Sequence, residues 1–441
     1  MRVAVISDTH FGDDLCTLVG QEGAFSLGPA YPSLSRAVGK VDYLVVLGDI
    51  LDFSVASYEK AYQKAKIFFR KLQEDSLASQ IIYVPGNHDF DIWNTVEHQV
   101  NVINQLRQGQ LPRAFKRSVP GVIDDRGFSG ERKLLLPDVA ARPEWHPHSV
   151  SYGNLFLDHL TRTRTAEGSI QGEKLTFNFA YPNLYLLTRG GESILLTHGH
   201  YFEAYWSLAS EWVTRFAGDD LKIARGGELS LREMVGINLP LSQLACTGIG
   251  QAQPLTEIAR RIQMEVYAGR IDTAKKYLDR WIEEFGIAEG SPWPLRLVRR
   301  YFIRWLKDRA LEALRTVEQT RYSKEFLRRP SVRDRFRNYY GYSLNEIARL
   351  RRQYHLEIPP PSHVIFGHTH QPIPWGSDEL TDRVEGRSVH FCNTGGWLFR
   401  MKDGLADFPG AEVVVYETES GVRSIPVRGA EWGYHSAAGE R

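Results

Sequence analysis

The chain has 441 residues, of which 42% are hydrophobic and 24% are charged, and its formal net charge is +1. This composition excludes a disordered chain, and the length predicts two or three domains, or one domain with a large insertion. The near-zero net charge gives no overall sign of a nucleic-acid-binding protein.

The cysteines and the apolar runs indicate the compartment. Cys16, Cys246 and Cys392 are distant in sequence and form no C-x-x-C pair, which argues against a disulfide framework and a thiolate zinc site. No run approaches 18 apolar residues, and a β-prone run begins at Val3, so we expect neither a membrane span nor a signal peptide. These features favour the cytoplasm, with a peripheral position at a membrane as an alternative.

Apolar, β-prone runs alternate with helical patterns in the first hundred residues. Runs at 3–6, 43–47 and 81–84 predict strands, and apolar residues at three- and four-residue spacing within 55–72 predict an amphipathic helix. Strand, helix and strand in succession imply a βαβ unit. A second helix is expected over about 92–107.

The chain then changes character. Residues 108–150 are rich in Pro, Arg and Gly and are interpreted as a surface excursion. Residues 175–198 predict a β-hairpin around Gly190-Gly191. Helical patterns dominate after residue 200, and β-prone runs return only after Pro359-Pro360-Pro361, at 363–366, 388–392 and 412–416. We therefore expect a core formed by 1–200 and 363–441, with a helical insertion or cap over 201–362.

Five of the apolar runs end in residues that can bind metal ions. Carboxyl ends of parallel strands meet at one edge of a sheet, which is where open α/β proteins bind ligands. Carboxylates, imidazoles and one amide, without a thiolate, suit divalent Mn, Fe or Zn. The five motifs are Asp8-x-His10, Gly48-Asp49, Gly86-Asn87-His88-Asp89, His198 and Gly367-His368-x-His370.

Each motif alone has a structural explanation, because Asp is a common turn former and a lone His is more often structural than a ligand. Their occurrence at five strand ends indicates a metal site instead. Outside the motifs, Asp52, His146, His148 and His159 are interpreted as structural or surface residues, and His200 as a polar loop residue.

In this order the motifs resemble those of the calcineurin-like metallophosphoesterase superfamily, over roughly 1–200 and 363–420. The resemblance implies an α/β fold in which two packed β-sheets are flanked by helices. It implies that His88 lies over the scissile phosphate as proton donor or transition-state stabiliser and that Asp89 orients it. It also implies two metal ions, the first held by Asp8, His10, Asp49 and His370 and the second by Asp49, Asn87, His198 and His368.

The implied activity is hydrolysis of a phosphate ester by a hydroxide that bridges the two ions, whose charge lowers the pKa of the bridging water. A large cap favours a phosphodiester or pyrophosphate over a monoester. The alternatives within the same family are a nuclease and a sugar-nucleotide lipid pyrophosphohydrolase at a membrane surface. A different alternative is an inactive scaffold of the same fold, against which the intact ligand set argues.

One segment of the predicted insertion is strongly basic. Between Trp293 and Arg352 there are 17 Lys and Arg against 6 Asp and Glu, a net charge of +11. Within it, 296–307 predicts a basic amphipathic helix with aromatic residues on its apolar side. Three interpretations stay open: packing within the cap with solvated or paired arginines, contact with an anionic membrane, and contact with a polyanion. No nucleic-acid-binding motif is present, and the sequence predicts no protein partner.

Overall fold

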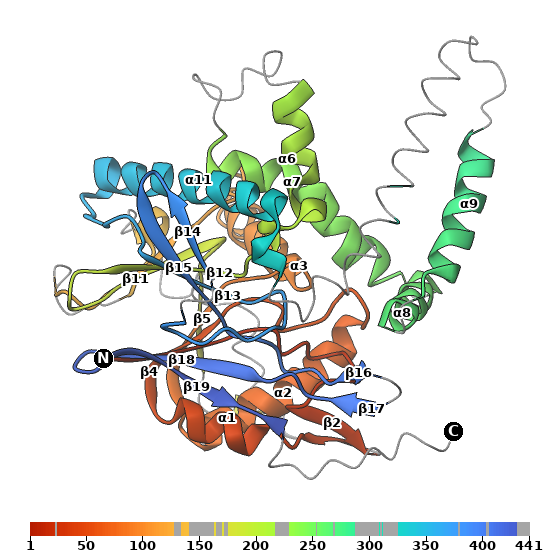
Figure 1. Ribbon diagram of the computed structural model, residues 1–441, viewed down its shortest axis with the longest axis horizontal. Coiled ribbons are helices and arrows are strands. Elements are labelled where there is room, and N and C mark those ends of the chain that lie inside the picture. The colour runs from red at the N-terminus through yellow and green to blue at the C-terminus, as the bar shows by residue number, and fades with distance from the viewer. Residues whose placement is uncertain are drawn as a thin grey trace.

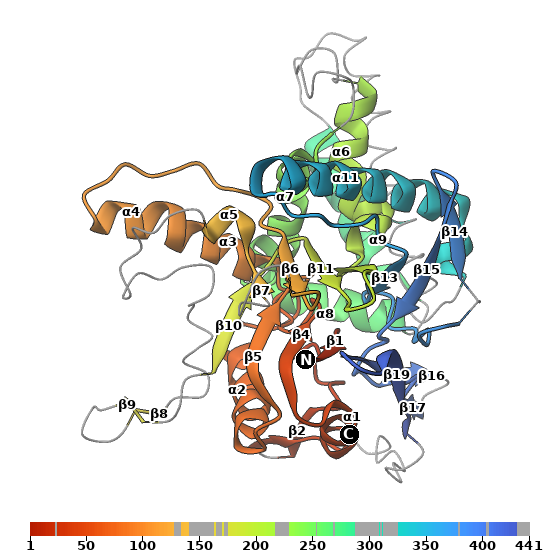
Figure 2. The same cartoon turned by 90° about the vertical axis from the view of Figure 1, so that its left-hand side faces the viewer.

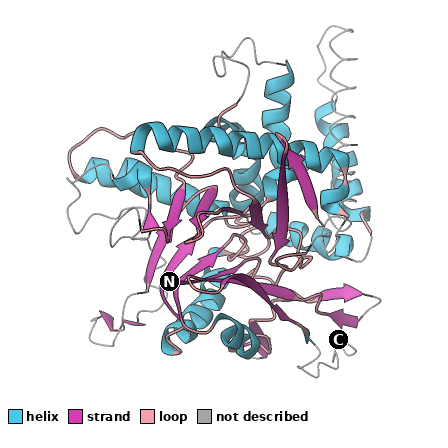
Figure 3. Cartoon of the chain, turned by 60° about the vertical axis from the view of Figure 1, so that its left-hand side comes forward, coloured by secondary structure: helices cyan, strands magenta, loops and turns pink. Residues whose placement is uncertain are grey.

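Two β-sheets packed face to face form the core of the computed structural model, and helices cover both outer sides (Figures 1 and 3). This arrangement confirms the predicted α/β fold class. The structure describes residues 1–22, 24–127, 134–140, 163–164, 170–171, 175–216, 229–252, 254–267, 270–286, 308, 311, 325–377, 380–402 and 405–429.

The first sheet joins the two ends of the chain. Four of its strands are parallel, and two strands from the C-terminal part complete it in antiparallel pairing. In order across the sheet they are β10 (Thr176–Phe179), β5 (Ala78–Tyr83), β4 (Val41–Val46), β1 (Arg2–Ile6), β18 (Ala411–Glu417) and β19 (Gly421–Val427).

The second sheet is mixed. Strands β12, β13 and β15 are parallel to one another, and β11 pairs antiparallel with β12 as the expected hairpin. Its order is β14 (Thr381–Val384), β15 (Arg387–Asn393), β13 (His363–Phe366), β12 (Ser193–Thr197), β11 (Asn183–Leu187), β6 (Gly121–Asp124) and β7 (Leu134–Leu135). Two-stranded ribbons flank the core: β2 (Val19–Glu22) with β3 (Ala24–Leu27), β8 (Thr163–Arg164) with β9 (Ile170–Gln171), and β16 (Arg400–Lys402) with β17 (Leu405–Asp407).

Alternation along the strands explains why the sheets form two layers. Successive side chains of a strand point to opposite faces. Val3 and Val5 of β1 belong to a buried cluster shared with Ile194 and Leu196 of β12, so these faces meet between the sheets. The intervening Ala4 packs in a second cluster that includes the helices on the outer faces. Strands that are apolar on both faces therefore require a sheet on one side and helices on the other.

Of the helices near the N-terminus, one matches the amphipathic helix predicted within 55–72, and one was not predicted. Helix α1 (Tyr31–Val38) and helix α2 (Tyr58–Glu74) lie below the first sheet (Figure 1). Helix α2 begins at Ser57, whose side chain accepts a hydrogen bond from Lys60 N, and the βαβ unit β4-α2-β5 is confirmed. The next helical run consists of α3 (Phe90–His98), the π-helix η1 (Gln99–Ile103) and α4 (Asn104–Arg107), and it projects from the core in Figure 2. A short helix, α5 (Pro137–Ala140), follows β7.

All described elements between β12 and β13 are helical, and we call this part of the chain the helical segment. No helix among the described residues is long and apolar enough to cross a membrane. Whether the segment is a separate domain with the boundaries 201–362 stays a prediction. Its elements are η3 (His200–Phe202), α6 (Ala204–Phe216), α7 (Leu231–Gln243), η4 (Leu244–Ile249), α8 (Pro254–Tyr267), α9 (Asp272–Gly286), η5 (Phe326–Arg328) and α11 (Pro330–Tyr354).

Two expectations need correction. Residues 108–150 are not only a surface excursion, because all four residues of β6 are buried and β6 pairs in parallel with β11. The start of the predicted hairpin region instead joins the first sheet as β10. The predicted basic helix at 296–307, together with His146, His148 and His159, lies outside the described residues.

Candidate metal centre

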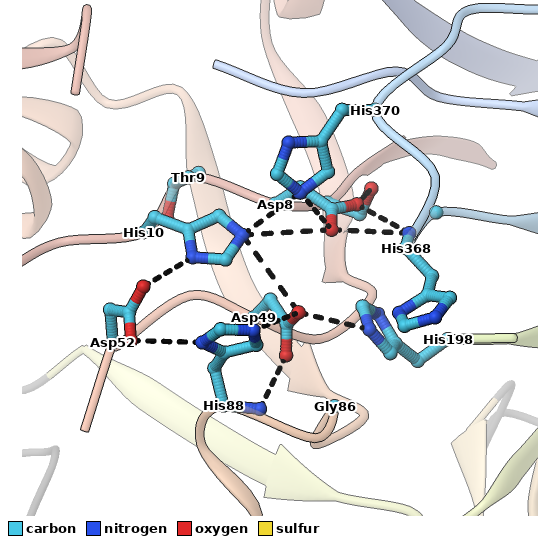
Figure 4. Close-up of polar contacts among 12 residues, drawn as sticks. Asp8, Thr9, His10, Asp49, Asp52, Gly86, His88, His198, His368 and His370 are labelled. Carbon is cyan, nitrogen blue, oxygen red and sulfur yellow. Dashed lines mark hydrogen bonds and ion pairs between the residues drawn. The ribbon is translucent and has the colours of Figure 1, made fainter. Parts of the chain in front are cut away.

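Eight candidate side chains from five strand exits meet at the carboxyl edges of the two sheets, and Figure 4 labels all of them except Asn87. Strands β1, β4 and β5 are parallel, as are β12 and β13, so within each sheet these exits lie on one edge. The structure therefore brings together residues that are up to 362 positions apart in sequence. They are Asp8 and His10 after β1, Asp49 after β4, Asn87 and His88 after β5, His198 after β12, and His368 and His370 after β13.

The backbone at these exits adopts an uncommon conformation. A non-glycine residue with positive φ costs on the order of 1–3 kcal/mol and is concentrated at functional sites. The close approach also explains a glycine of the motifs, because a Cβ on Gly367 would lie 2.2 Å from Asp8 Oδ2. Five candidate ligands have positive φ: Asp8 (53°), His10 (48°), Asp49 (53°), His368 (68°) and His370 (55°).

The first donor group consists of Asp8, His10 and His370, all buried. His370 Nε2 lies 3.3 Å from Asp8 Oδ1 and 3.1 Å from His10 Nε2. Asp49 Oδ2 lies 3.8 Å from His10 Nε2. These are the four residues of the first expected ligand set.

The second donor group consists of Asp49, His198 and His368, with donor atoms within 4.8 Å of one another. His198 Nε2 lies 3.2 Å from Asp49 Oδ2 and 3.1 Å from Asn87 Oδ1. These are the four residues of the second expected ligand set. Asp49 lies in both, which is the position that a bridging carboxylate requires.

The donor atoms fit divalent cations. Two imidazole nitrogens only 3.1 Å apart, on His10 and His370, satisfy each other only when one carries a proton, whereas a cation between them accepts both lone pairs. The buried carboxylates supply the negative charge that such cations need, and the described donors include no thiolate. This donor set suits Mn, Fe and Zn alike.

The far sides of the imidazoles are held by acceptors. The second nitrogen of a ligating histidine usually donates a hydrogen bond, which fixes the ring. His10 Nδ1 lies 2.7 Å from Asp52 Oδ2, His198 Nδ1 lies 3.0 Å from Leu47 O, and His368 Nε2 lies 2.9 Å from Glu203 Oε2. Donation from these atoms would leave His10 Nε2, His198 Nε2 and His368 Nδ1 as the candidate ligand atoms.

His88 lies at the edge of the centre and is accessible from solvent. Its side chain is 16% exposed, whereas that of Asp49 is 1% exposed. Its Nδ1 contacts Asp52 Oδ1 at 2.9 Å and Ser54 Oγ at 2.6 Å, and its Nε2 lies 4.0 Å from Asp49 Oδ2. Asp52 therefore holds the ring so that Nε2 faces the donor groups.

Asp89 has a different position from the expected one. Its Oδ1 accepts from Gly86 N at 2.6 Å, and its Oδ2 accepts from Ile50 N at 2.7 Å and from the Tyr83 hydroxyl. These bonds direct the carboxylate to the loop backbone, where it holds the Asn87-His88 turn. Asp52 therefore has the contact with His88 that the resemblance implied for Asp89.

Three residues near the centre were missed or misread in the sequence. Asp52 was expected to be a structural or a surface residue, and its full burial excludes the surface; its spacing of three from Asp49 at the same strand exit was the available signal of a role at the centre. His200 is buried rather than part of a polar loop, and neither ring nitrogen has a hydrogen-bond partner among the described residues. No sequence signal distinguished Glu203, because its contact with His368 depends on the fold.

In the metal-free protein, the carboxylates and imidazoles of the centre stabilise one another's charged forms. Burial opposes ionisation of Asp49, but His198 and His88 hold the pKa of its carboxyl well below the usual range. Burial lowers the pKa of the His10 imidazole, but hydrogen bonds with Asp52 and Asp8 outweigh it and raise this pKa to about 10. Asp49 likewise outweighs burial at His198 and raises its pKa to about 9.

Metal binding should therefore release protons. Below their raised pKa values His10 and His198 are protonated, and a ligating imidazole must be neutral, so affinity should rise as pH increases from 6 to 8. Titration calorimetry with Mn²⁺ at pH 7.5, in two buffers of different ionisation enthalpy, should show release of about one or two protons per chain. Equal heats in both buffers would contradict the protonated state of these imidazoles.

Two comparisons with known proteins each give a match to phosphoesterases. A family model described as calcineurin-like phosphoesterase matches residues 1–225. A Pseudomonas aeruginosa protein described as 3′,5′-cyclic adenosine monophosphate phosphodiesterase is 26% identical over 171 residues, which are 35% of this chain and 57% of that protein. The matched part therefore spans a little over half the length of this curated relative.

Proposed function

The chain belongs to the calcineurin-like phosphoesterase family, and from this premise we propose that it hydrolyses phosphoric esters with two divalent metal ions. The observation that carries the proposal is that Asp49 of the second donor group also lies beside the first, with its Oδ2 3.8 Å from His10 Nε2, and that His88 lies at the accessible edge. An inactive scaffold has no need of two complete ligand sets. When bound, the two ions supply Lewis acidity, lower the pKa of a water and neutralise phosphoryl oxygens.

The residues of the chain then have distinct roles. Asp49 would contact both ions, and the other six candidate ligands would complete the two sites as described above. His88 Nε2 faces the centre and donates a proton to the leaving oxygen or stabilises its developing charge. Asp52 keeps His88 in this orientation through Nδ1.

We propose a phosphodiester or pyrophosphate bond as the substrate. The Pseudomonas aeruginosa relative is described as a phosphodiesterase, which supports a diester over a monoester. A nuclease and a sugar-nucleotide lipid pyrophosphohydrolase are the other forms of the same chemistry.

A substrate panel with Mn²⁺ tests this proposal. The panel contains p-nitrophenyl phosphate, bis-p-nitrophenyl phosphate, cyclic adenosine monophosphate, single-stranded DNA and a nucleoside-diphosphate lipid in anionic vesicles. We expect hydrolysis of the bis-ester with higher kcat/KM than the monoester, and its loss after chelation. Preference for the monoester would overturn the proposed substrate class, and no hydrolysis of any substrate by metal-loaded protein would favour the scaffold.

The basic part of the chain bears on the lipid and polyanion alternatives. In its described part, Arg337 contacts Asp382 at 2.8 Å and Arg349 contacts Asp138 at 2.8 Å. These pairs favour the structural interpretation for α11. Contact with an anionic surface is thus a proposal for 296–307 alone, tested by sedimentation of the protein with vesicles that contain or lack anionic lipid.

A further inference from the structure

We propose that the helical segment acts as a clamp on the metal centre, in which Gly250 and Gln251 hold the loop that orients His88. The loop consists of residues 52–57, and we call it the Asp52 loop. This inference rests on the proposed function for its kinetic consequence, but its structural part is testable without activity. It assigns the helical segment a positioning role in the reaction.

One side of the Asp52 loop carries the groups that reach the centre. Asp52 contacts Nδ1 of His10 through one carboxylate oxygen and Nδ1 of His88 through the other. Ser54 Oγ donates to Asp52 Oδ1 at 2.6 Å and lies 2.6 Å from His88 Nδ1. The loop backbone also joins the His88 turn, since Phe53 N donates to His88 O at 3.1 Å. A displacement of this loop therefore moves the His88 ring, whereas His10 is also held by a backbone hydrogen bond of 2.9 Å from its own N–H to the exit of β4.

The other side of the loop presents backbone groups to the helical segment. Gln251 Nε2 donates to Phe53 O at 3.1 Å and to Ala56 O at 3.0 Å, and Gln251 Oε1 accepts from Tyr58 N at 3.0 Å. A single carboxamide thus ties three backbone groups of the loop and its exit. Arg260 Nη2 adds a bond to Val55 O at 3.0 Å. Loop backbone groups normally bind water at the surface, so these contacts convert a surface loop into a fixed one.

The backbone of the helical segment packs directly against the Asp52 loop at Gly250. A Cβ on Gly250 would lie 1.6 Å from Phe53 O, so every other residue type would force the two segments apart. Gly250 directly follows the π-helix η4, a type of turn that is frequent at functional sites. Within η4, Cys246 Sγ donates to the carbonyl of Asn87 at 2.7 Å, so the same turn also supports the loop of a candidate metal ligand.

The proposed clamp predicts that variants that loosen it have a lower kcat and little change in KM. A shift of about 1 Å in a positioned catalytic group costs up to about 100-fold in rate, even when its cause is distant from the chemistry. None of the Gln251 contacts given above involves a residue of either donor group. Gln251 therefore acts through Asp52 and His88. It is a positioning residue and not a catalytic one.

The first test is hydrogen exchange of the metal-free protein, followed by mass spectrometry. In Gln251→Ala, peptides that cover 52–58 and 86–90 should exchange at least about 10-fold faster than in the wild type, because their backbone bonds open locally. Gln251→Glu should speed exchange by at least as much, because its carboxylate would face two carbonyl oxygens. If Gln251 only filled space, Gln251→Glu would leave exchange unchanged. Gln243→Ala, a half-buried position at the end of α7, is the matched control. Unchanged exchange in both peptides would overturn the clamp whether or not the protein is an enzyme.

The second test is a double-variant cycle on a diester with a poor leaving group. Gln251→Ala should lower kcat about 10- to 100-fold with little change in KM and with unchanged Mn²⁺ stoichiometry. If Gln251 acts through His88, the variant with both Gln251→Ala and His88→Ala should be no slower than His88→Ala alone. Multiplied losses, or loss of metal in Gln251→Ala, would show a general structural role instead. Failure of the wild type to hydrolyse any ester would count against the proposed function and leave the exchange result to decide the clamp.

Discussion

Replacement of Asp49 by alanine is expected to remove both metal ions and to reduce hydrolysis to background. Asp49 is the one residue shared by the two expected ligand sets, and its Oδ2 lies 3.2 Å from His198 Nε2 and 3.8 Å from His10 Nε2. Loss of its charge leaves Asp8 as the one carboxylate in the two expected ligand sets, which is too little negative charge for two divalent ions. Elemental analysis of purified protein should show about two ions per chain in the wild type and almost none in the variant.

Asp49→Asn separates metal loss from a folding defect. Its side-chain oxygen can still accept the 2.8 Å hydrogen bond from His88 N, so the turn should remain intact while the charge is lost. Asp14→Asn, at an exposed carboxylate that pairs with Lys60, is the control and should keep both ions. Full metal occupancy and turnover in Asp49→Ala would show that Asp49 is not a bridging ligand.

Replacement of His88 by alanine is expected to preserve metal and to lower turnover. His88 Nε2 is 4.0 Å from Asp49 Oδ2, and the residue is partly exposed where a phosphate would approach. General acid or charge stabilisation at a leaving group is worth roughly 10²- to 10⁴-fold in rate. Steady-state kinetics beside elemental analysis should show this separation, and His98→Ala, an exposed histidine of α3, should leave both unchanged.

The leaving group decides between the two roles of His88. A proton donor matters less when the leaving group is p-nitrophenolate, because that anion is stable without a proton. We therefore expect a smaller loss with bis-p-nitrophenyl phosphate than with cyclic adenosine monophosphate. Equal losses would exclude proton donation and favour stabilisation of charge.

Local sequence was sufficient for much of the core. The runs at 3–6, 43–47 and 81–84 are apolar on both faces and rich in β-branched residues, which favours strands between two layers, and β1, β4 and β5 lie there. The spacing of Ala61, Ala65 and Phe68 on one helical face likewise predicts α2. Strand β6 was missed because four residues among Pro and Arg give too short a signal, and its pairing with β11 stabilises it.

The sequence by itself determined the strand exits and the chemical types of the candidate ligands, because a strand's end and a donor atom are both local properties. Only the tertiary structure decided the contacts between exits. Asp52 and Asp89 look equivalent as carboxylates near a motif, yet one reaches His88 and the other binds its own loop backbone. The same holds for Gln251, which is 193 residues from Tyr58 and acquires its position from the packing of the helical segment. Contacts across such distances depend on how buried faces match in three dimensions, which no local pattern encodes.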